Sequence, residues 1–382
     1  MLGATPMMKY RLMAPGPTPV PEDVLTEMAK PIWHHRTPAF EKVMAEVQAD
    51  LKWLYQTKND VLLLSSSGTG AMEASLINTC SPGDTILVVD GGKFGERFAK
   101  IGKAFGVNVD VIKVTWGQAV APAAIEEKLK QKEYRAVCVQ ASETSTGVEH
   151  PIKEIAALVK NYPSTIAIVD AITALGVINI PTDEWGIDIL ICGSQKALML
   201  PPGLATLSVS DKAWLLADKS TCPKFYLNLK TERKNIAANT TAWTPPVSLI
   251  QGLRLVLQNM RKEGLEAMFK RHATMAASIR NAAKAIGLKL YAPEAPSTSV
   301  SAIYAPEGID SGKIVKNLRE KFNMTIANGQ DDAKGKIFRI GHLGYYDMLD
   351  MVSVWSAIEK SLADLGYKFE IGKGVAEIIK AL

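Results

Sequence analysis

The chain has 382 residues, of which 47% are hydrophobic and 22% are charged, so it can bury a large core and form two domains. Its formal net charge is only +5 and it has no Lys/Arg-rich run with interleaved aromatic residues, which argues against nucleic acid as a partner. The N-terminal stretch has neither a signal-peptide pattern nor an apolar run of membrane length. Its four cysteines form no CxxC pair, which is typical of reduced thiols, so we expect a cytoplasmic protein without membrane contact.

The N-terminus is predicted to be an extended arm, residues 1–21. Four prolines between Ala14 and Pro21 exclude a helix there, because each proline fixes φ and removes a backbone donor. We expect this arm to lie on the folded body. Apolar residues then recur every three or four positions from Pro38 to Tyr55, which predicts an amphipathic helix.

From residue 61 onward, short apolar segments alternate with helical ones. The predicted strands are Val61–Leu64, Thr85–Val89, Val107–Val114, Ala136–Val139, Ile166–Val169, Ile187–Cys192 and Ala205–Ser210. This alternation requires right-handed crossovers, which produce a mostly parallel sheet covered on both faces. We therefore predict an α/β fold with a large domain at residues 22–255. Ligands should bind where the strands end.

A smaller α+β domain is predicted at residues 256–382, after the turn-forming segment Trp243–Pro246. One long helix over residues 248–286 should connect the two domains. The other predicted elements are strands near Val300–Tyr304 and Ile337–Ile340, and helices at Ser311–Phe322, Met348–Leu365 and Val375–Leu382.

Two ionisable residues stand at the ends of predicted strands. Lys196 follows the strand Ile187–Cys192, and a lysine held there among small and apolar neighbours loses hydration, which lowers its pKa as a Schiff-base lysine requires. Asp170 ends the strand Ile166–Val169, where a buried carboxylate needs a cation or a donor such as a protonated pyridine nitrogen. Considered singly, a solvated loop lysine and a helix N-cap remain open alternatives. One crossover between the strands would place both side chains in one crevice.

The segment Ser65–Gly70 follows the first strand and is predicted to open a helix near Ala71. Small residues let backbone N–H groups approach an anion, and a helix N-terminus adds partial positive charge, so Ser67, Gly68 and Thr69 form a candidate phosphate cup. An ordinary strand-to-helix turn is the open alternative. The cup, the lysine and the aspartate match the phosphate, the aldehyde and the ring nitrogen of pyridoxal 5′-phosphate, which is the predicted cofactor.

The sequence resembles the class V aminotransferases, and among them most closely the alanine–glyoxylate, serine–glyoxylate and serine–pyruvate enzymes. The resemblance spans nearly the whole chain. Its motifs are Ala14–Pro17, Ser67–Ala74, Ser145–Val148, Val169-Asp170 and Gly193–Leu198, the last followed by Pro201-Pro202-Gly203. The resemblance implies the pyridoxal-phosphate-dependent transferase fold type I, with a mostly parallel seven-stranded sheet in the large domain and a smaller α+β C-terminal domain.

The resemblance also implies roles for single residues. Lys196 would carry the cofactor and move a proton at the substrate Cα, and Asp170 would keep the pyridine nitrogen protonated. Phe94 would stack on the ring, where many relatives have tryptophan, and Ser145 would bind on the O3′ side. The remaining implied cofactor contacts are Ser67, Gly68, Thr69, which is histidine in some relatives, Gln195 and Thr244. A core position remains the alternative for Phe94.

Substrate contacts are implied for Arg339, as the clamp for an α-carboxylate, and for Gly16. Arg36 also resembles a motif near the site entrance, although a structural role is equally open. Thr244 resembles a threonine that reaches the other subunit's phosphate, so a homodimer with a shared active site is expected. No metal is expected, because no histidine has HxxxH or HExxH spacing or a neighbouring ligand pattern.

The predicted activity is a ping-pong aminotransferase that moves an amino group from alanine or serine to glyoxylate or pyruvate. An aspartate or phosphonate donor of the same family is the alternative. A cysteine desulfurase is disfavoured because no cysteine follows Cys222. A non-catalytic or redox subunit is the alternative of a different class, since some relatives are labelled as the small subunit of a soluble hydrogenase. Iron-based hydrogen chemistry requires thiolate ligands that four scattered cysteines do not easily supply.

Overall fold

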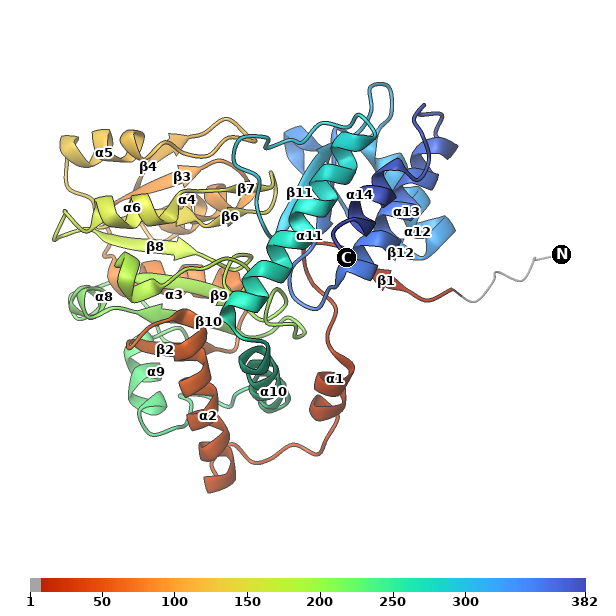
Figure 1. Cartoon of the computed structure of the whole chain (residues 1–382). Helices are drawn as coiled ribbons and strands as arrows, with labels where there is room; N and C mark the ends of the chain where they lie inside the picture. The colour runs from red at the N-terminus through yellow and green to blue at the C-terminus, as the bar shows by residue number, and fades with distance from the viewer. Residues whose placement is uncertain (1–7) are drawn as a thin grey trace.

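The computed structural model describes residues 8–382 and confirms the α/β architecture around one seven-stranded sheet (Figure 1). The strands are, in sheet order, β2 (Asp60–Leu64), β10 (Ala205–Val209), β9 (Ile189–Gly193), β8 (Ile166–Asp170), β5 (Ala136–Gln140), β3 (Thr85–Asp90) and β4 (Asn108–Lys113). Five of them, β9, β8, β5, β3 and β4, run parallel. Strand β10 is antiparallel to both neighbours, β2 and β9, so the sheet is mostly parallel with one reversed strand.

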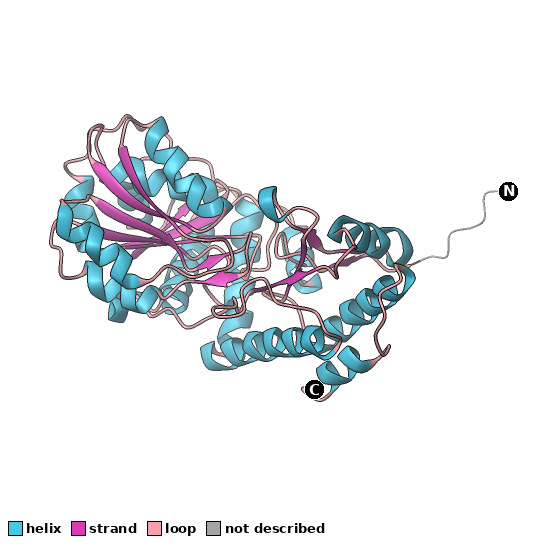
Figure 2. Ribbon diagram, turned by 90° about the horizontal axis from the view of Figure 1, so that it is seen from above, coloured by secondary structure: helices cyan, strands magenta, loops and turns pink. Residues whose placement is uncertain are grey.

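Helices cover both faces of this sheet (Figure 2), as its doubly buried apolar strands require. They are α2 (Pro38–Tyr55), α3 (Gly68–Thr79), α4 (Lys93–Ala104), α5 (Pro122–Gln131), α6 (Ile152–Val159), α7 (Thr182–Trp185), α8 (Asp211–Ala217) and α9 (Leu229–Ile236). Helix α2 spans the predicted residues, because Thr37 caps its N-terminus, Pro38 occupies its first turn and its apolar stripe is buried. Short helices such as α1 (Glu22–Met28), α7, α8 and α9 were not predicted.

The prediction of one long helix over residues 248–286 is wrong. The structure has two helices there, α10 (Val247–Glu263) and α11 (Leu265–Ala285), separated by Gly264. Gly264 has φ +85° and ψ 149°, a conformation that is open almost only to glycine, so it ends one helix and starts the next in a new direction. Figure 1 shows α11 running between the sheet and the C-terminal part of the molecule.

The C-terminal part has its own antiparallel sheet of β11 (Val300–Tyr304), β14 (Ile337–Gly341) and β13 (Ala327–Asn328). Helices α12 (Ser311–Phe322), α13 (Met348–Asp364) and α14 (Lys373–Ile379) pack around it with α11. Its buried apolar residues form a second core, separate from that of the large sheet. The predicted domain boundary at residues 255 and 256 falls inside α10, and the domain limits stay a prediction.

The N-terminal arm is attached to the C-terminal part. Strand β1 (Arg11–Leu12) pairs in parallel with β12 (Met324–Thr325), and the Gly341 amide donates to the Met13 carbonyl over 2.9 Å. Residues 14–21 follow without regular structure and lead to α1, while the first seven residues of the predicted arm lie outside the described range. The arm therefore lies on the folded body, as expected. The side chain of Met13 packs in the second core.

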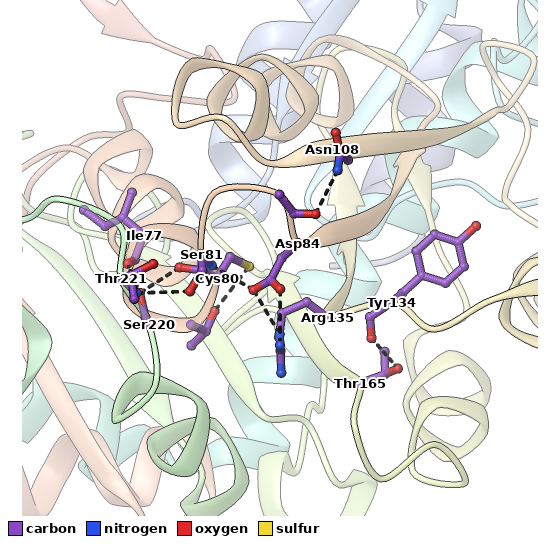
Figure 3. A network of polar contacts seen from close by, with 12 residues as sticks. Ile77, Cys80, Ser81, Asp84, Asn108, Tyr134, Arg135, Thr165, Ser220 and Thr221 are labelled. Carbon is purple, nitrogen blue, oxygen red and sulfur yellow. Dashed lines mark hydrogen bonds and ion pairs between the residues drawn. The ribbon is translucent and has the colours of Figure 1, made fainter.

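A polar network connects the N-terminal ends of the parallel strands in the large sheet (Figure 3). Asp84, just before β3, pairs with Arg135, just before β5, through two hydrogen bonds of 3.1 and 3.2 Å. Thr165, just before β8, donates to the Tyr134 carbonyl over 2.6 Å. These contacts thus connect the N-terminal ends of β3, β5 and β8. No helix in residues 8–382 is long and apolar enough to cross a membrane.

Candidate active site

Lys196 lies in the turn after β9, at the C-terminal ends of the parallel strands. Its side chain is 9% exposed, and its Nζ donates to the Pro15 carbonyl over 2.6 Å. Burial lowers the pKa of Lys196 to about 8, and the nearby Asp170 carboxylate only partly opposes this shift. A substantial fraction of the amine is therefore neutral near pH 8, which is the form that attacks a carbonyl carbon.

The N-terminal arm covers this lysine closely. Gly16 has φ +134°, which other residues rarely adopt, and a Cβ atom there would lie 2.1 Å from Nζ of Lys196, so a larger residue would have to displace this side chain or the arm. The Thr18 hydroxyl donates to the Lys196 carbonyl over 2.8 Å, and the Thr18 amide donates to the Gln195 carbonyl over 3.1 Å. The predicted substrate residue Gly16 is thus directly beside the candidate nucleophile.

Asp170 ends β8, which is parallel to β9 and adjacent to it. Its carboxylate accepts a hydrogen bond from the Ile172 amide over 2.9 Å and makes no ion pair with a described residue. Burial raises the pKa of Asp170 to about 7, while the charges of Arg97 and Lys196 act in the opposite direction. Such a carboxylate lacks a cationic partner, and a protonated pyridine nitrogen would supply one.

The predicted phosphate cup lies at the start of α3. Ser67 is the N-cap residue and its side chain makes no capping bond, while Gly68 and Thr69 belong to the first turn, so the helix starts earlier than the predicted Ala71. A Cβ atom at Gly68 would lie 2.3 Å from Ile172 Cδ1, so the backbone at Gly68 lies close to the Ile172 side chain. The Oε1 atom of Gln195 is buried without a hydrogen-bond partner. Backbone amides in the first turn suit a bound phosphate, whereas the Oε1 atom of Gln195 is an acceptor and would need a donor from a ligand.

Phe94 lies in the first turn of α4, next to two residues that the sequence did not single out. The guanidinium of Arg97 lies 4.7 Å from the centroid of the Phe94 ring, and its Nη1 donates to Thr69 Oγ1 over 3.0 Å. Arg97 makes no ion pair with a described residue. The buried carboxylate of Glu143 accepts hydrogen bonds from the Phe94 and Gly95 amides. The only sequence signal for Arg97 is its position one turn after Phe94 on a helix face.

Arg339 lies in β14 and is 6% exposed. Its guanidinium donates to the Thr144 carbonyl over 2.8 Å and to the Asn328 carbonyl over 3.0 and 2.7 Å, without a carboxylate partner. Burial lowers the pKa of Arg339 to about 10, which leaves it charged at neutral pH. A buried guanidinium held only by neutral carbonyls suits a carboxylate ligand.

Thr244 and Arg36 are not brought to this edge within one chain. Thr244 is exposed and lines a surface groove together with Ile32, Trp33 and the prolines that follow it. Arg36 is exposed in the segment before α2. Among the residues that the structure describes, no group of three or more histidine, cysteine, aspartate or glutamate side chains could hold a metal ion.

The other predicted site residues have the chemical groups that pyridoxal 5′-phosphate needs. A neutral lysine amine, a buried carboxylate without a cation and the free first-turn amides of α3 lie at one sheet edge. Comparison with known proteins identifies the family: residues 12–344 match the model of the class V aminotransferases, described as "Aminotransferase class-V". The chain belongs to this family, and pyridoxal phosphate is its cofactor.

The relatives carry different names. The chain is 45% identical to a protein named soluble hydrogenase, small subunit, from Synechococcus, over 98% of each chain. It is 37% identical to an L-aspartate–glyoxylate aminotransferase from Paracoccus denitrificans and 35% identical to a serine–glyoxylate aminotransferase from Methylorubrum extorquens, in both cases over 96% of this chain and 94% of the relative. The hydrogenase name belongs to that relative, while the matched family is one of aminotransferases.

The fold is shared with solved structures of the same family. The crystal structure of ureidoglycine–glyoxylate aminotransferase from Bacillus subtilis superposes with a TM-score of 0.94 at 28% identity, over 100% of this chain and 99% of that chain. The reversed strand β10 and the C-terminal part are therefore features of an aminotransferase fold.

The raised pKa of Asp170 predicts how the stability of the cofactor-free protein depends on pH. The buried carboxyl holds its proton up to about pH 7, whereas its ordinary pKa is 3.8, so its contribution is fully present below about pH 4 and is lost as the pH rises through about 7. Asp170→Asn removes this titration and can still accept from the Ile172 amide. We expect the mutant to gain roughly 2 kcal/mol more over wild type at pH 8 than at pH 5. Denaturant melts at the two pH values measure this, and equal differences would contradict it.

The contact between Gly16 and Lys196 predicts that Gly16→Ala impairs cofactor uptake. The added methyl group cannot occupy the same space as Nζ, so either the arm or the lysine must move. We expect at least a tenfold weaker affinity for pyridoxal phosphate, measured by titration of its visible absorbance. Gly83→Ala is the matched control, because Gly83 also has a positive φ of +90° but nothing within 4 Å of the added Cβ. An unchanged affinity in Gly16→Ala would show that the close contact is absent in solution.

Proposed function

We propose that the chain transfers an amino group from a small amino acid, alanine or serine, to glyoxylate or pyruvate in a ping-pong reaction. The observation that carries this proposal is the lone buried guanidinium of Arg339 near a lysine whose pKa is lowered to about 8. One clamp for the α-carboxylate and one neutral amine are what a small amino acid or a small 2-oxo acid needs. The serine–glyoxylate relative supports the same substrates.

The side chains divide the work as follows. Bound pyridoxal phosphate supplies the electron sink that makes the proton on the substrate Cα removable. Lys196 would hold the cofactor, and its Nζ would take this proton as a general base. Asp170 accepts a hydrogen bond from the pyridine nitrogen and keeps it protonated. Arg339 exchanges its carbonyl partners for the substrate carboxylate, which fixes the Cα atom near Nζ.

The cofactor is held by the remaining predicted contacts. The first turn of α3, with Ser67, Gly68 and Thr69, receives the phosphate, and we assign the Nε2 group of Gln195 as a further donor to it. Phe94 stacks on the ring. We assign Ser145 to the O3′ side of the cofactor. The four free, buried cysteines remain in keeping with a cytoplasmic location.

An aspartate donor is the second candidate. Its distal carboxylate needs a second cation in the site. Arg97 is such a cation: it lies beside the phosphate cup and makes no ion pair within residues 8–382. The L-aspartate–glyoxylate relative favours the same donor. A phosphonate donor would use the same guanidinium. Discrimination between these donors depends on contacts worth only about 1–3 kcal/mol, so it requires a direct measurement.

We propose a homodimer in which Thr244 completes the partner's site. An exposed aromatic cluster stands beside Thr244: Phe225 is 77% exposed and Tyr226 is 48% exposed, and both rings contact Trp243. Ile32, across the groove from Thr244, is 68% exposed. Exposed apolar side chains of this size favour burial against a second copy of the chain.

The reaction is tested with purified protein and its bound cofactor. Alanine, serine, aspartate and 2-aminoethylphosphonate are added separately while the visible absorbance is recorded, followed by glyoxylate or pyruvate. The expected result is loss of the band with alanine or serine and its return with one oxo acid. Lys196→Ala should lose turnover by at least about 10⁴-fold, while the control Lys212→Ala, a partly buried lysine at the opposite edge of the sheet, should keep it. An active Lys196→Ala enzyme, or a band that no donor changes, would reject the proposal.

Subunit mixing tests the shared site. Thr244→Val alone should weaken cofactor binding several-fold, and Lys196→Ala alone should be inactive. A mixed dimer of the two variants contains one site with an intact Lys196 from one chain and an intact Thr244 from the other. We expect the mixed dimer, purified away from the two parental dimers, to have about half of the activity of the wild-type dimer. If the mixed protein remains as weak as Thr244→Val, or if size-exclusion chromatography shows an active monomer, Thr244 does not act across an interface.

A further inference from the structure

Lys93 and Asp331 form an ion pair between the two parts of the chain. Lys93 is the first residue of α4, directly before Phe94, and Asp331 begins the short 3₁₀ helix η1 (Asp331–Ala333) between β13 and β14. The Nζ atom of Lys93 lies 2.5 Å from Oδ2 of Asp331 and 2.5 Å from Oε2 of Glu96. These contacts raise the pKa of Lys93, so its ammonium group stays charged at neutral pH. One cation thus connects a carboxylate of its own helix to a carboxylate of the C-terminal part.

Both members of this pair are unfavourable at their own positions. A cation in the first turn of a helix meets the positive end of the helix dipole, so Lys93 disfavours the start of α4 unless carboxylates neutralise it. Asp331 has φ +43°, a left-handed conformation that costs free energy for a residue other than glycine. Two locally unfavourable residues that meet in one contact indicate a requirement of the tertiary structure.

Asp331 lies at the tip of the hairpin that carries Arg339. At the base of this hairpin, the carbonyl of Asn328 in β13 accepts from Nε and Nη2 of Arg339 over 3.0 and 2.7 Å. The turn between them is tightly folded, because a Cβ atom at Gly329 would lie 1.9 Å from the carbonyl oxygen of Ala333. A displacement of the tip is therefore transmitted to the Asn328 carbonyl and to the guanidinium that it holds.

The hairpin lies at the edge of its sheet that is farther from the large part's serine contacts. The Ser142 hydroxyl, in β6 (Ser142–Glu143), bonds to the hydroxyls of Ser297 and Ser299 over 2.7 and 2.9 Å, just before β11. Strand β11 is at one edge of the three-stranded sheet, whereas β13 is at the other edge and has only two residues. The tip beyond β13 therefore depends on contacts of its own to stay on α4.

Arg339 supplies one such contact through its hydrogen bond to the Thr144 carbonyl. In the proposed function, Arg339 exchanges this partner for the substrate carboxylate. The ion pair of Lys93 and Asp331 involves neither the guanidinium nor the substrate, so it can persist through that exchange. It can keep the hairpin in place while the guanidinium changes its partner.

We propose that Lys93 and Asp331 are positioning residues, whose ion pair holds the β13–β14 hairpin against α4 and thereby places the Arg339 guanidinium for a carboxylate ligand. This inference rests on the proposed function, in which Arg339 binds the substrate carboxylate. A contact that acts equally on the bound substrate and on the reacting species lowers KM and leaves kcat unchanged. Loss of the pair should therefore raise KM for the amino donor and for the oxo acid together.

Four variants and one control isolate the pair. Asp331→Asn and Lys93→Met each remove it, and asparagine also tolerates a positive φ, so the turn is retained. Lys93→Arg keeps the cation. Glu96→Gln removes the carboxylate within α4 and leaves Asp331 paired. Lys321→Met is the matched control, because it breaks an ion pair of 2.9 Å with Asp364 inside the C-terminal part.

The first measurement is amide hydrogen exchange of the peptide 327–336 in the full-length protein. The side chain of Lys93 is 28% exposed and that of Asp331 is 55% exposed, so water screens the pair and the effect should be severalfold. We expect exchange about threefold faster in Asp331→Asn and in Lys93→Met, and no further increase in the double mutant. Lys93→Arg, Glu96→Gln and Lys321→Met should resemble wild type. Wild-type exchange in Asp331→Asn, or equal acceleration in Lys321→Met, would overturn the proposal.

The second measurement is the steady-state KM and kcat of the same variants with the donor and acceptor that the absorbance experiment identifies. We expect KM for both substrates to rise about threefold in Asp331→Asn and in Lys93→Met, with kcat within twofold of wild type and with recovery in Lys93→Arg. Simple attraction of an anionic substrate predicts a different pattern, because loss of the Asp331 charge would then lower KM while loss of the Lys93 charge would raise it. That opposite pattern would overturn the positioning role. If wild type has no turnover, the proposed function fails, whereas the exchange measurement still decides whether the pair holds the hairpin.

Discussion

Three buried ionisable groups without ion-pair partners set the constraint on which this structure depends. Lys196, Asp170 and Arg339 each lie at or near the edge where the parallel strands end, and each is satisfied within the chain by backbone groups only. Burying ions in this way costs folding free energy, which shows in the shifted pKa values of all three groups. In the proposed function, the cofactor and a carboxylate substrate would supply the missing countercharges. Because burial of the charged forms of these groups costs free energy, the site favours ligands that carry the opposite charges.

The two parts of the chain contribute differently to this site. The large sheet supplies Lys196 and Asp170 from adjacent strands, and α3 and α4 supply the proposed phosphate cup and the proposed ring contact. The C-terminal part supplies Arg339, whose guanidinium reaches back to the Thr144 carbonyl near β6. Glu143 lies at the same junction, beside Thr144 and the start of α4. The relative placement of base and carboxylate clamp therefore depends on contacts between the parts.

The sequence was sufficient for features that depend on local patterns. Alternating apolar strands and helices predicted the sheet, and Lys196 and Asp170 could be found because each follows or ends such a strand. It was insufficient for features that depend on tertiary contacts: the reversal of β10, the burial of Glu143 and the approach of Arg97 to Thr69 leave no periodic signal. The break at Gly264 was missed because a helical apolar pattern continues on both sides, although glycine there was a readable stop signal. The predicted roles of the site residues remain to be tested.

The arm also orders events during synthesis of the protein. The ribosome makes Pro15, Gly16 and Thr18 first, but their partners, the turn at Lys196 and strand β12, emerge only much later. A nascent chain can form the large sheet, including the turn at Lys196, before strand β12 is available to pair with the arm. The arm is held at both places only after β12 has left the ribosome, and Arg339 emerges later still, so an incomplete polypeptide cannot present a finished reaction centre.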